Sequence, residues 1–157
     1  MTEKQIVIRY TEYTSASEMT PEDQKVVNAA LEARIGSYSP YSHFQVGAAL
    51  LLADGTIIKG ANQENAAYPS GLCAERTALF AAGANYPDVP PRTLAIVAFD
   101  HGHLLDEPAT PCGSCRQVMA ESQKRAGGPI AVILIGARRI WKFDSVDAVL
   151  PFIFDSL

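Results

Sequence analysis

Thr93-Leu94-Ala95-Ile96-Val97-Ala98-Phe99 forms an almost unbroken apolar run near the middle of the chain. A run of this length and composition is typical of a strand buried on both faces of a sheet. Helical segments are expected on either side of it, over residues 73–83 and 112–126, and a second apolar strand over residues 130–135. Strands that alternate with helices form a sheet with helices on both faces, so the sequence predicts an α/β fold built on one mixed sheet.

Turn and capping residues place the elements that come before this run. Thr20-Pro21 is a helix start and Gly36 a helix stop, so a helix is expected between them. Asp54-Gly55 predicts a hairpin turn between two strands within residues 46–59. These elements add a helix and two antiparallel strands to the predicted sheet.

The two ends of the chain carry weaker patterns. A short strand is expected at residues 140–143 and a final helical turn or two at 145–150. Residues 4–13 look extended but polar. We therefore expect one domain over residues 21–157, preceded by an N-terminal extension, residues 1–20, to which the sequence assigns no role.

Composition and charge limit the function classes. The chain has 157 residues, 48% of them hydrophobic, which predicts one packed domain rather than a disordered chain. Its net charge is −4 and its Lys and Arg residues are scattered, which argues against nucleic-acid binding. The chain has no signal-peptide core and no apolar run long enough for a bilayer, so we expect a cytoplasmic, soluble protein with no membrane partner.

All three cysteines lie in two short motifs, Cys73-Ala74-Glu75-Arg76 and Pro111-Cys112-Gly113-Ser114-Cys115-Arg116-Gln117. Both motifs follow polar loops and open helices, which places them together at one end of the sheet. Three thiolates can hold Zn²⁺ and leave one position open for water. A glutamate beside that water can move protons. The motifs therefore predict a catalytic zinc site rather than a purely structural one. In this site Cys73, Cys112 and Cys115 hold one zinc per chain, and Glu75 is catalytic.

Arg76 and Arg116 each follow a predicted ligand closely. Three thiolates and Zn²⁺ carry a net charge of −1, and guanidinium groups that hydrogen-bond to sulfur would offset it. We expect this role for both arginines.

Two other interpretations of the cysteines remain open from the residues alone. Cys112-Gly-Ser-Cys115 also has the form of a redox pair, although such a pair does not need a third cysteine beside a carboxylate. A purely structural zinc site would need a fourth ligand, for which His43, His101 and His103 are the candidates. We expect these histidines to be exposed loop residues instead.

The chain resembles the small nucleoside cytidine deaminases from about residue 21 to its end. The resemblance rests on the two cysteine motifs and on two further stretches, Tyr41-Ser-His-Phe44-Gln-Val-Gly-Ala-Ala-Leu50 and Asn62-Gln-Glu64-Asn65-Ala-Ala-Tyr68. It implies a three-layer α/β/α fold with a mixed five-stranded sheet. It also implies a homotetramer with sites at subunit interfaces.

The resemblance further implies hydrolytic deamination of cytidine and 2′-deoxycytidine to uridine and 2′-deoxyuridine, with release of ammonia, as in pyrimidine salvage. The enzyme would be a hydrolase acting on the C–N bond of a cyclic amidine. In this family the zinc is held by three cysteines, and the glutamate is a proton shuttle rather than a ligand. Those roles fall on Cys73, Cys112, Cys115 and Glu75.

Nucleoside contacts follow from the same resemblance. It implies that Asn62 and Glu64 bind ribose hydroxyls and that Phe44 contacts the base, with Ala74 beside them. Tyr68 and Phe154 would complete the site of a neighbouring subunit. From the residues alone, the asparagines could be turn residues and the aromatic residues could be core or interface.

One residue departs from the family pattern, and two rival functions stay open. Gln63 stands where the family usually has a β-branched apolar residue, which affects the predicted substrate preference because its neighbours are the ribose contacts.

The rival enzyme is a related zinc deaminase of an antibiotic nucleoside such as blasticidin S. The rival of another class is a non-enzymatic zinc or redox protein.

Overall fold

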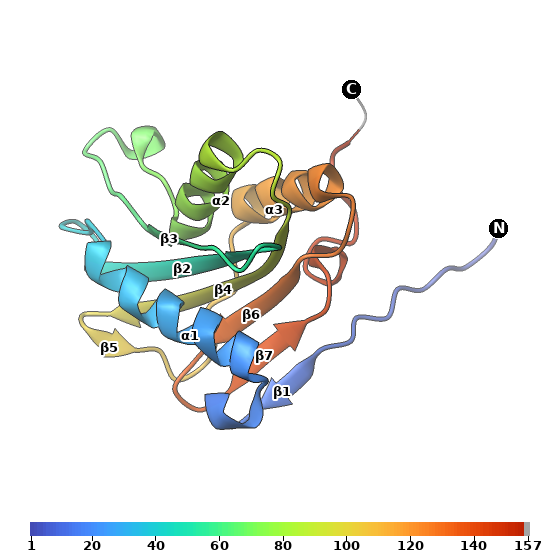
Figure 1. The fold of residues 1–157 in the computed structure, drawn as a ribbon, viewed down its shortest axis with the longest axis horizontal. Coiled ribbons are helices and arrows are strands. Elements are labelled where there is room, and N and C mark those ends of the chain that lie inside the picture. The colour runs from blue at the N-terminus through green and yellow to red at the C-terminus, as the bar shows by residue number, and fades with distance from the viewer. Residues whose placement is uncertain (156–157) are drawn as a thin grey trace.

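The computed structural model describes residues 1–155 of the chain (Figure 1). Its strands are β1 (Thr11–Tyr13), β2 (Phe44–Leu52), β3 (Ile57–Ala61), β4 (Pro91–Asp100), β5 (His103–Leu104), β6 (Ala131–Ile135) and β7 (Ile140–Phe143). Its α-helices are α1 (Pro21–Ala33), α2 (Ala74–Asn85) and α3 (Gly113–Ala126). Single turns of 3₁₀ helix lie at η1 (Ala16–Glu18), η2 (Arg34–Gly36), η3 (Tyr68–Ser70) and η4 (Val146–Ala148).

The strands form one mixed sheet in the order β1-β7-β6-β4-β2-β3, with β5 paired to the end of β4. The β4 and β6 strands are parallel, and the other pairs are antiparallel. The predicted mixed sheet is confirmed, but within residues 1–155 it has seven strands rather than five. The two extra strands, β1 and β5, have three and two residues, too few to show an alternating pattern in the sequence.

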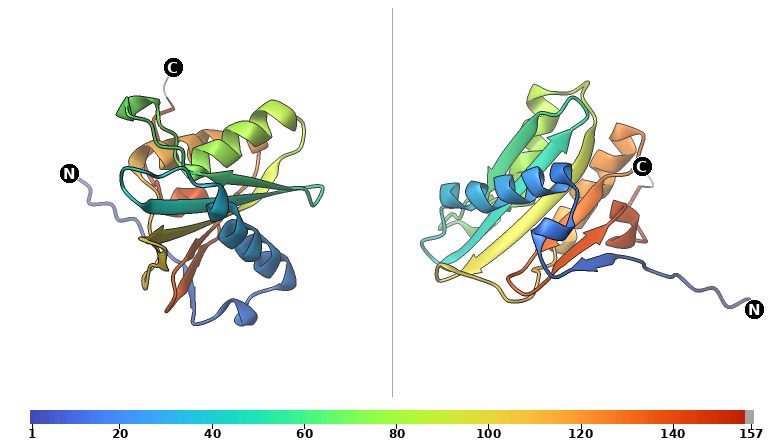
Figure 2. Two further views of the ribbon diagram at one scale, coloured as in Figure 1. Left: turned by 90° about the vertical axis from the view of Figure 1, so that its left-hand side faces the viewer. Right: turned by 60° about the horizontal axis from the view of Figure 1, so that its bottom comes forward.

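Helices cover both faces of the sheet (Figures 1 and 2). One face packs on α1 through a core that includes Val26, Leu51 and Ile133. The other packs on α2 and α3 through a core that includes Leu50 and Met119. Neighbouring strand residues such as Leu50 and Leu51 enter opposite cores because side chains alternate across a strand. This double burial explains why the central strands are apolar throughout, and it confirms the predicted three-layer fold.

Helix α2 lies unusually close to the sheet because a glycine faces it. A Cβ atom on Gly60 of β3 would lie 2.4 Å from the carbonyl oxygen of Ala74 and 2.6 Å from the amide nitrogen of Ala78. No side chain larger than hydrogen fits without movement of the helix. Gly60 therefore fixes the position of the first turn of α2, where the first cysteine motif lies.

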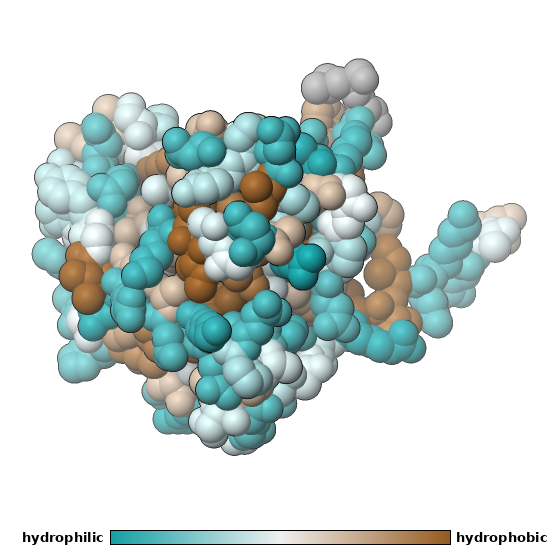
Figure 3. All heavy atoms as spheres, in the orientation of Figure 1, coloured by the Kyte–Doolittle hydropathy of each residue, from teal (hydrophilic) through white to brown (hydrophobic). Residues whose placement is uncertain are grey.

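The N-terminal segment joins the sheet only at its end. Residues 11–13 form β1, which pairs antiparallel with β7 at the edge of the sheet. Tyr10 packs on the rings of Trp141 and Phe143, with centroid distances of 5.5 and 5.3 Å. Before Tyr10 the chain runs outward from the body as an extended segment, and apolar atoms line part of it (Figure 3).

At the other end of the chain, the expected final helical turn is a single 3₁₀ turn, η4. None of the helices in residues 1–155 has the length and apolar character needed to cross a membrane.

Candidate metal centre and active site

The three cysteines converge at the N-terminal ends of two helices. Cys73 is the residue before α2, Cys112 is the residue before α3, and Cys115 lies in the first turn of α3. Their sulfur atoms lie within 4.8 Å of one another. Because α2 and α3 pack side by side on one face of the sheet, two cysteine motifs some forty residues apart form one site, as predicted.

The electrostatics of the site favour the thiolate form of Cys73 and oppose that of Cys115. The hydrogen bond from the Cys115 thiol, with help from the Arg76 guanidinium, lowers the pKa of Cys73 to about 5. The same hydrogen bond and burial raise the pKa of Cys115. Two or three adjacent thiolates would repel one another, so a bound cation is needed to ionise the whole set.

The donor set fits zinc. Three thiolate sulfurs within reach of one point suit a tetrahedral Zn²⁺ and leave one position for another ligand. Among the described residues this cluster contains no histidine or carboxylate. His101 instead pairs with Asp100 over 2.7 Å at an exposed position, in line with the expected loop role.

Glu75 is a buried carboxyl beside the cluster. It lies in the first turn of α2, and only 5% of its surface is exposed. Burial raises the pKa of Glu75 above its ordinary value, and the negative charge on Cys73 acts in the same direction. A raised pKa makes the carboxylate a stronger base than an ordinary glutamate, which suits a residue that takes up and later returns a proton.

The two arginines do different things. Arg76 donates from Nη2 to the Cys73 sulfur over 3.5 Å, as the sequence led us to expect. Arg116 does not donate to sulfur. Its Nε and Nη1 atoms donate to the carbonyl oxygens of Pro111, over 2.7 Å, and Val149, over 2.9 Å. Arg116 therefore ties the loop before Cys112 to the C-terminal segment, because its side chain meets carbonyl oxygens before it can reach the thiolates.

The side chain of Asn62 makes three hydrogen bonds within the described chain, and one N–H of its Nδ2 has no partner there. Its Oδ1 accepts from the Val46 amide over 2.8 Å and from the Ser37 hydroxyl over 2.6 Å. Its Nδ2 donates to the carbonyl oxygen of Phe44 over 2.8 Å. Asn62 thus holds the first residues of β2, including Phe44, at the end of β3.

Glu64 anchors the loop before β2 in a similar way. Its Oε2 accepts from the backbone amides of Tyr41, over 2.9 Å, and Ser42, over 3.2 Å, and its Oε1 accepts from the Ser42 hydroxyl. The hydroxyl contact is the main cause that lowers the pKa of Glu64, so the carboxylate is ionised at neutral pH. A negative, partly exposed carboxylate is therefore held beside Phe44.

Gln63 lies between these two residues in the sequence, and its side chain hydrogen-bonds to the backbone. Its Nε2 donates to the carbonyl oxygen of Gly36 over 2.9 Å. Its main chain forms bridges to Tyr38 on one side and Leu72 on the other. The polar side chain thus joins η2, the 3₁₀ turn that follows α1, to the loop that leads into the Cys73 motif. An apolar β-branched residue could not make this hydrogen bond.

Of the remaining predicted site residues, two are buried or partly buried and two are exposed. Ala74 is fully buried, and Phe44 is partly buried at the start of β2. Tyr68 and Phe154 are 87% and 66% exposed. Sequence reasoning did not assign Gln117, whose side chain makes two hydrogen bonds to the main chain of Phe154, over 2.7 and 3.1 Å. Nothing in the sequence around Gln117 indicated this contact, because Phe154 lies 37 residues further along the chain.

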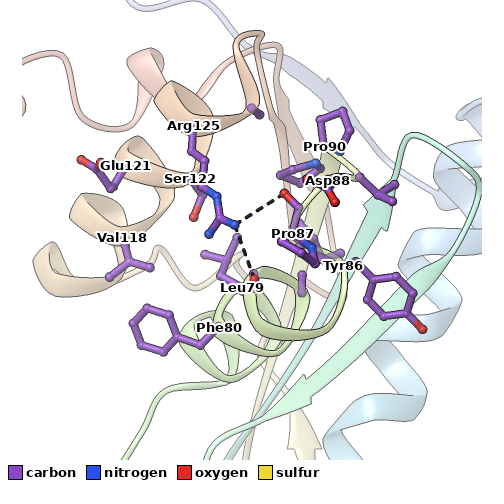
Figure 4. A pocket seen from close by; sticks show the side chains of 16 residues that line it. Leu79, Phe80, Tyr86, Pro87, Asp88, Pro90, Val118, Glu121, Ser122 and Arg125 are labelled. Carbon is purple, nitrogen blue, oxygen red and sulfur yellow. Dashed lines mark hydrogen bonds between the residues drawn. The ribbon is translucent and has the colours of Figure 1, made fainter.

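One cavity of the described chain lies away from the cysteines. It has a volume of about 600 Å³ and lies between the C-terminal halves of α2 and α3 and the loop at residues 86–91 (Figure 4). Arg125 reaches across it to the carbonyl oxygens of Gly83 and Pro87, both over 3.5 Å. None of the predicted site residues lines this cavity.

Fold and site together define a zinc-binding protein of the α/β class. The family model for the cytidine and deoxycytidylate deaminase zinc-binding region matches residues 20–126. A cytidine deaminase of Halalkalibacterium halodurans is 52% identical over 98 residues, which cover 62% of this chain and 70% of that protein. A cytidine deaminase of Sporosarcina psychrophila is 41% identical over 131 residues, which cover 83% of this chain and 90% of that protein.

Solved structures of cytidine deaminases have the same fold as this chain. Cytidine deaminase from Burkholderia pseudomallei superposes with a TM-score of 0.71 at 38% identity, covering 87% of this chain and all of that chain. Cytidine deaminase from Mycobacterium tuberculosis gives a TM-score of 0.65 at 32% identity, covering 84% and 96%. This chain therefore belongs to the cytidine and deoxycytidylate deaminase family, and it is a hydrolytic deaminase with a zinc-binding region.

Proposed function

We propose that this enzyme deaminates cytidine and 2′-deoxycytidine to uridine and 2′-deoxyuridine, with water consumed and ammonia released. One observation carries the proposal. The buried Glu75 lies in the same helical turn that follows Cys73, beside three sulfurs within 4.8 Å of one another. Relatives named cytidine deaminase at up to 52% identity support the choice of substrate.

Glu75 moves the protons in this proposal. Zinc held by Cys73, Cys112 and Cys115 would supply Lewis-acid activation of a water molecule. The Glu75 carboxylate takes a proton from the attacking water and delivers it to N3 of the cytosine ring. It later helps to protonate the amino group that leaves C4 as ammonia. The raised pKa of Glu75 suits both directions of transfer.

Arg76 tempers the charge of the sulfurs. Three thiolates reduce the acidifying effect that a zinc ion exerts on water, because they donate charge to it. A guanidinium that donates to the Cys73 sulfur withdraws part of that charge. Arg116 acts at a distance, by holding the main chain on which Cys112 lies.

Asn62 and Glu64 bind the sugar, with Phe44 and Ala74 against the base. The ionised Glu64 accepts hydrogen bonds from loop amides and retains lone pairs for a ribose hydroxyl. The same charge disfavours a nearby phosphate, so free nucleosides are preferred over CMP. This preference also distinguishes the enzyme from deaminases of polynucleotides.

The active enzyme is a homotetramer whose neighbouring chains complete each site through Tyr68 and Phe154. Two aromatic side chains that are 87% and 66% exposed in the single chain support this, because such groups are normally covered in an assembly. Residues 21–157 form the catalytic domain and residues 1–20 an extension of it. The protein acts in the cytoplasm, in the salvage of pyrimidine nucleosides.

The experiment is a substrate panel. Purified, zinc-loaded protein is incubated separately with cytidine, 2′-deoxycytidine, CMP and blasticidin S, and the loss of cytosine absorbance is followed. We expect turnover of both free nucleosides and little turnover of CMP. Turnover of blasticidin S alone would favour the antibiotic deaminase, and no turnover of any compound with zinc bound would contradict the proposal.

A further inference from the structure

The segment before β1, residues 1–10, is extended chain that belongs to no strand and pairs with no other described segment. Ile6, Val7, Ile8 and Tyr10 are 55%, 62%, 50% and 51% exposed, although they have strong strand propensity. The segment projects from the body in line with β1, and it contains no proline (Figures 1 and 3). An exposed, extended segment with apolar side chains of this kind can pair as a strand with another chain.

The edge of the sheet continues this segment. Residues 11–13 pair with β7 on one side only, so their other edge is free among the described elements. Ile6, Ile8 and Tyr10 alternate along the segment and so share one face if it continues as a strand. Tyr10 already packs on Trp141 and Phe143, so this face extends the apolar surface of β7.

We propose that residues 3–13 pair antiparallel with the same residues of a second copy of this chain, with Ile8 on the two-fold axis. The two seven-stranded sheets would then form one continuous sheet across the axis. A two-fold axis makes such a contact self-complementary, because each residue meets its counterpart from the opposite direction. A second copy is therefore the occupant that the segment itself specifies.

The positions of the charged residues favour this register. With Ile8 opposite Ile8, Lys4 lies opposite Glu12, and Ile6 lies opposite Tyr10. A shift that placed Arg9 on the axis would bring two like charges together, which destabilises a strand pair. Apolar pairs at the centre and opposite charges at both ends thus favour one arrangement.

The first test introduces a thiol on the axis in the full-length, zinc-loaded protein. Opposed residues in an antiparallel pair have Cα atoms about 4.5–5.5 Å apart, within the range that a disulfide bridges. With oxidised glutathione, Ile8→Cys should form a disulfide between two copies about tenfold faster, or more, than Thr2→Cys, which lies far from its own counterpart in this register. Peptide mapping distinguishes this link from the native cysteines. Equal rates for the two variants would overturn the proposal.

The second test measures hydrogen exchange in the unmodified full-length chain. Amides of residues 5–10 should be protected in concentrated protein and should lose protection on dilution, as pairing is lost. Ile8→Lys should abolish this protection, because it places two ammonium groups on the axis. Ile35→Lys, a change at an apolar side chain that is 78% exposed and outside the segment, should leave it intact. Unprotected amides at all concentrations, or protection that survives Ile8→Lys, would overturn the proposal.

Discussion

Arg76 lies one helical turn after Cys73, and its Nη2 atom donates to the Cys73 sulfur over 3.5 Å. Its Nε atom is buried and has no hydrogen-bond partner among the described side chains and backbone groups. The guanidinium of this partly buried side chain contacts the Cys73 sulfur, so we infer that it stabilises the thiolate more than the packing of the fold. Its effect should therefore appear in metal binding before it appears in the stability of the fold.

We expect Arg76→Ala to weaken zinc retention by about 10–100-fold, as loss of a group that hydrogen-bonds to a metal ligand typically does. The measurement is competition with a chelator, followed through zinc release. Arg125→Ala is the matched control, because Arg125 donates to the carbonyl oxygens of Gly83, near the far end of α2, and of Pro87, in the loop after it. Equal zinc retention in the Arg76→Ala variant and the unmodified protein would remove the proposed role.

The pH dependence of the loop at residues 41–42 follows from Glu64. Its pKa lies below the ordinary value of 4.5, so its hydrogen bonds stabilise the loop above that pH and are lost as the pH falls through the folded-state pKa. We expect Glu64→Gln at neutral pH to increase hydrogen exchange at the Tyr41 and Ser42 amides. The unmodified chain should lose the same protection only in acid. Unchanged exchange in the variant would show that the carboxylate does not hold the loop.

At the scale of single residues, the sequence predicted site residues well where they belong to a rare residue type and lie in short motifs. Cys73, Cys112 and Cys115 could be predicted as one site because they are the only cysteines of the chain and lie in two short motifs that each open a helix. Arg116 could not be assigned correctly, because its partners are carbonyl oxygens whose positions depend on the whole fold. The hydrogen bonds of Asn62 to main-chain groups of β2 could not be predicted for the same reason.

Helix α2 carries Glu75 and directly follows Cys73, and its position depends on Gly60 of β3. We expect Gly60→Ala to destabilise the protein by about 1–3 kcal/mol, because the added methyl group would overlap the backbone of α2. It should also lower zinc affinity, since the first turn of α2 must move. The measurement is denaturant unfolding together with zinc titration. Gly128→Ala, at a glycine with no atom within 4 Å of the added carbon, should be nearly neutral. Equal stability of the two variants would contradict this account.

The elements themselves were largely predictable. The capping residues before α1 and the apolar runs of β4 and β6 gave their positions, because they depend on local chemistry. The short strands β1 and β5 were not predictable. Each exists because a neighbouring strand offers free hydrogen-bonding groups, and two or three residues carry no periodic signal of that.

On the scale of the whole molecule, the C-terminal tail is held beside α3 by Gln117. The two hydrogen bonds to the main chain of Phe154 leave its ring 66% exposed. We expect Phe154→Ala to fold normally and to lower kcat/KM for cytidine by about tenfold or more, as loss of an aromatic contact at an interface does. Phe152→Ala, at a neighbouring ring that is 80% exposed, is the matched control. Full activity of Phe154→Ala would remove this residue from the proposed site.

Assembly could not be derived from composition or periodicity. A surface aromatic residue such as Tyr68 has the same sequence pattern whether it meets water or another chain. The fold class, in contrast, followed from the alternation of strands and helices, because burial on both faces constrains a whole sheet at once.

The central claim is that Glu75 moves protons beside a zinc ion held by three cysteines. The most direct test compares Glu75→Gln with the unmodified enzyme for zinc content and for cytidine turnover in the same preparation. We predict about one zinc per chain in both proteins, in line with a single three-cysteine site. We also predict a turnover rate at least about 100-fold lower in the variant, because amide cannot transfer the protons. A zinc-loaded Glu75→Gln variant with a near-normal rate would contradict the account.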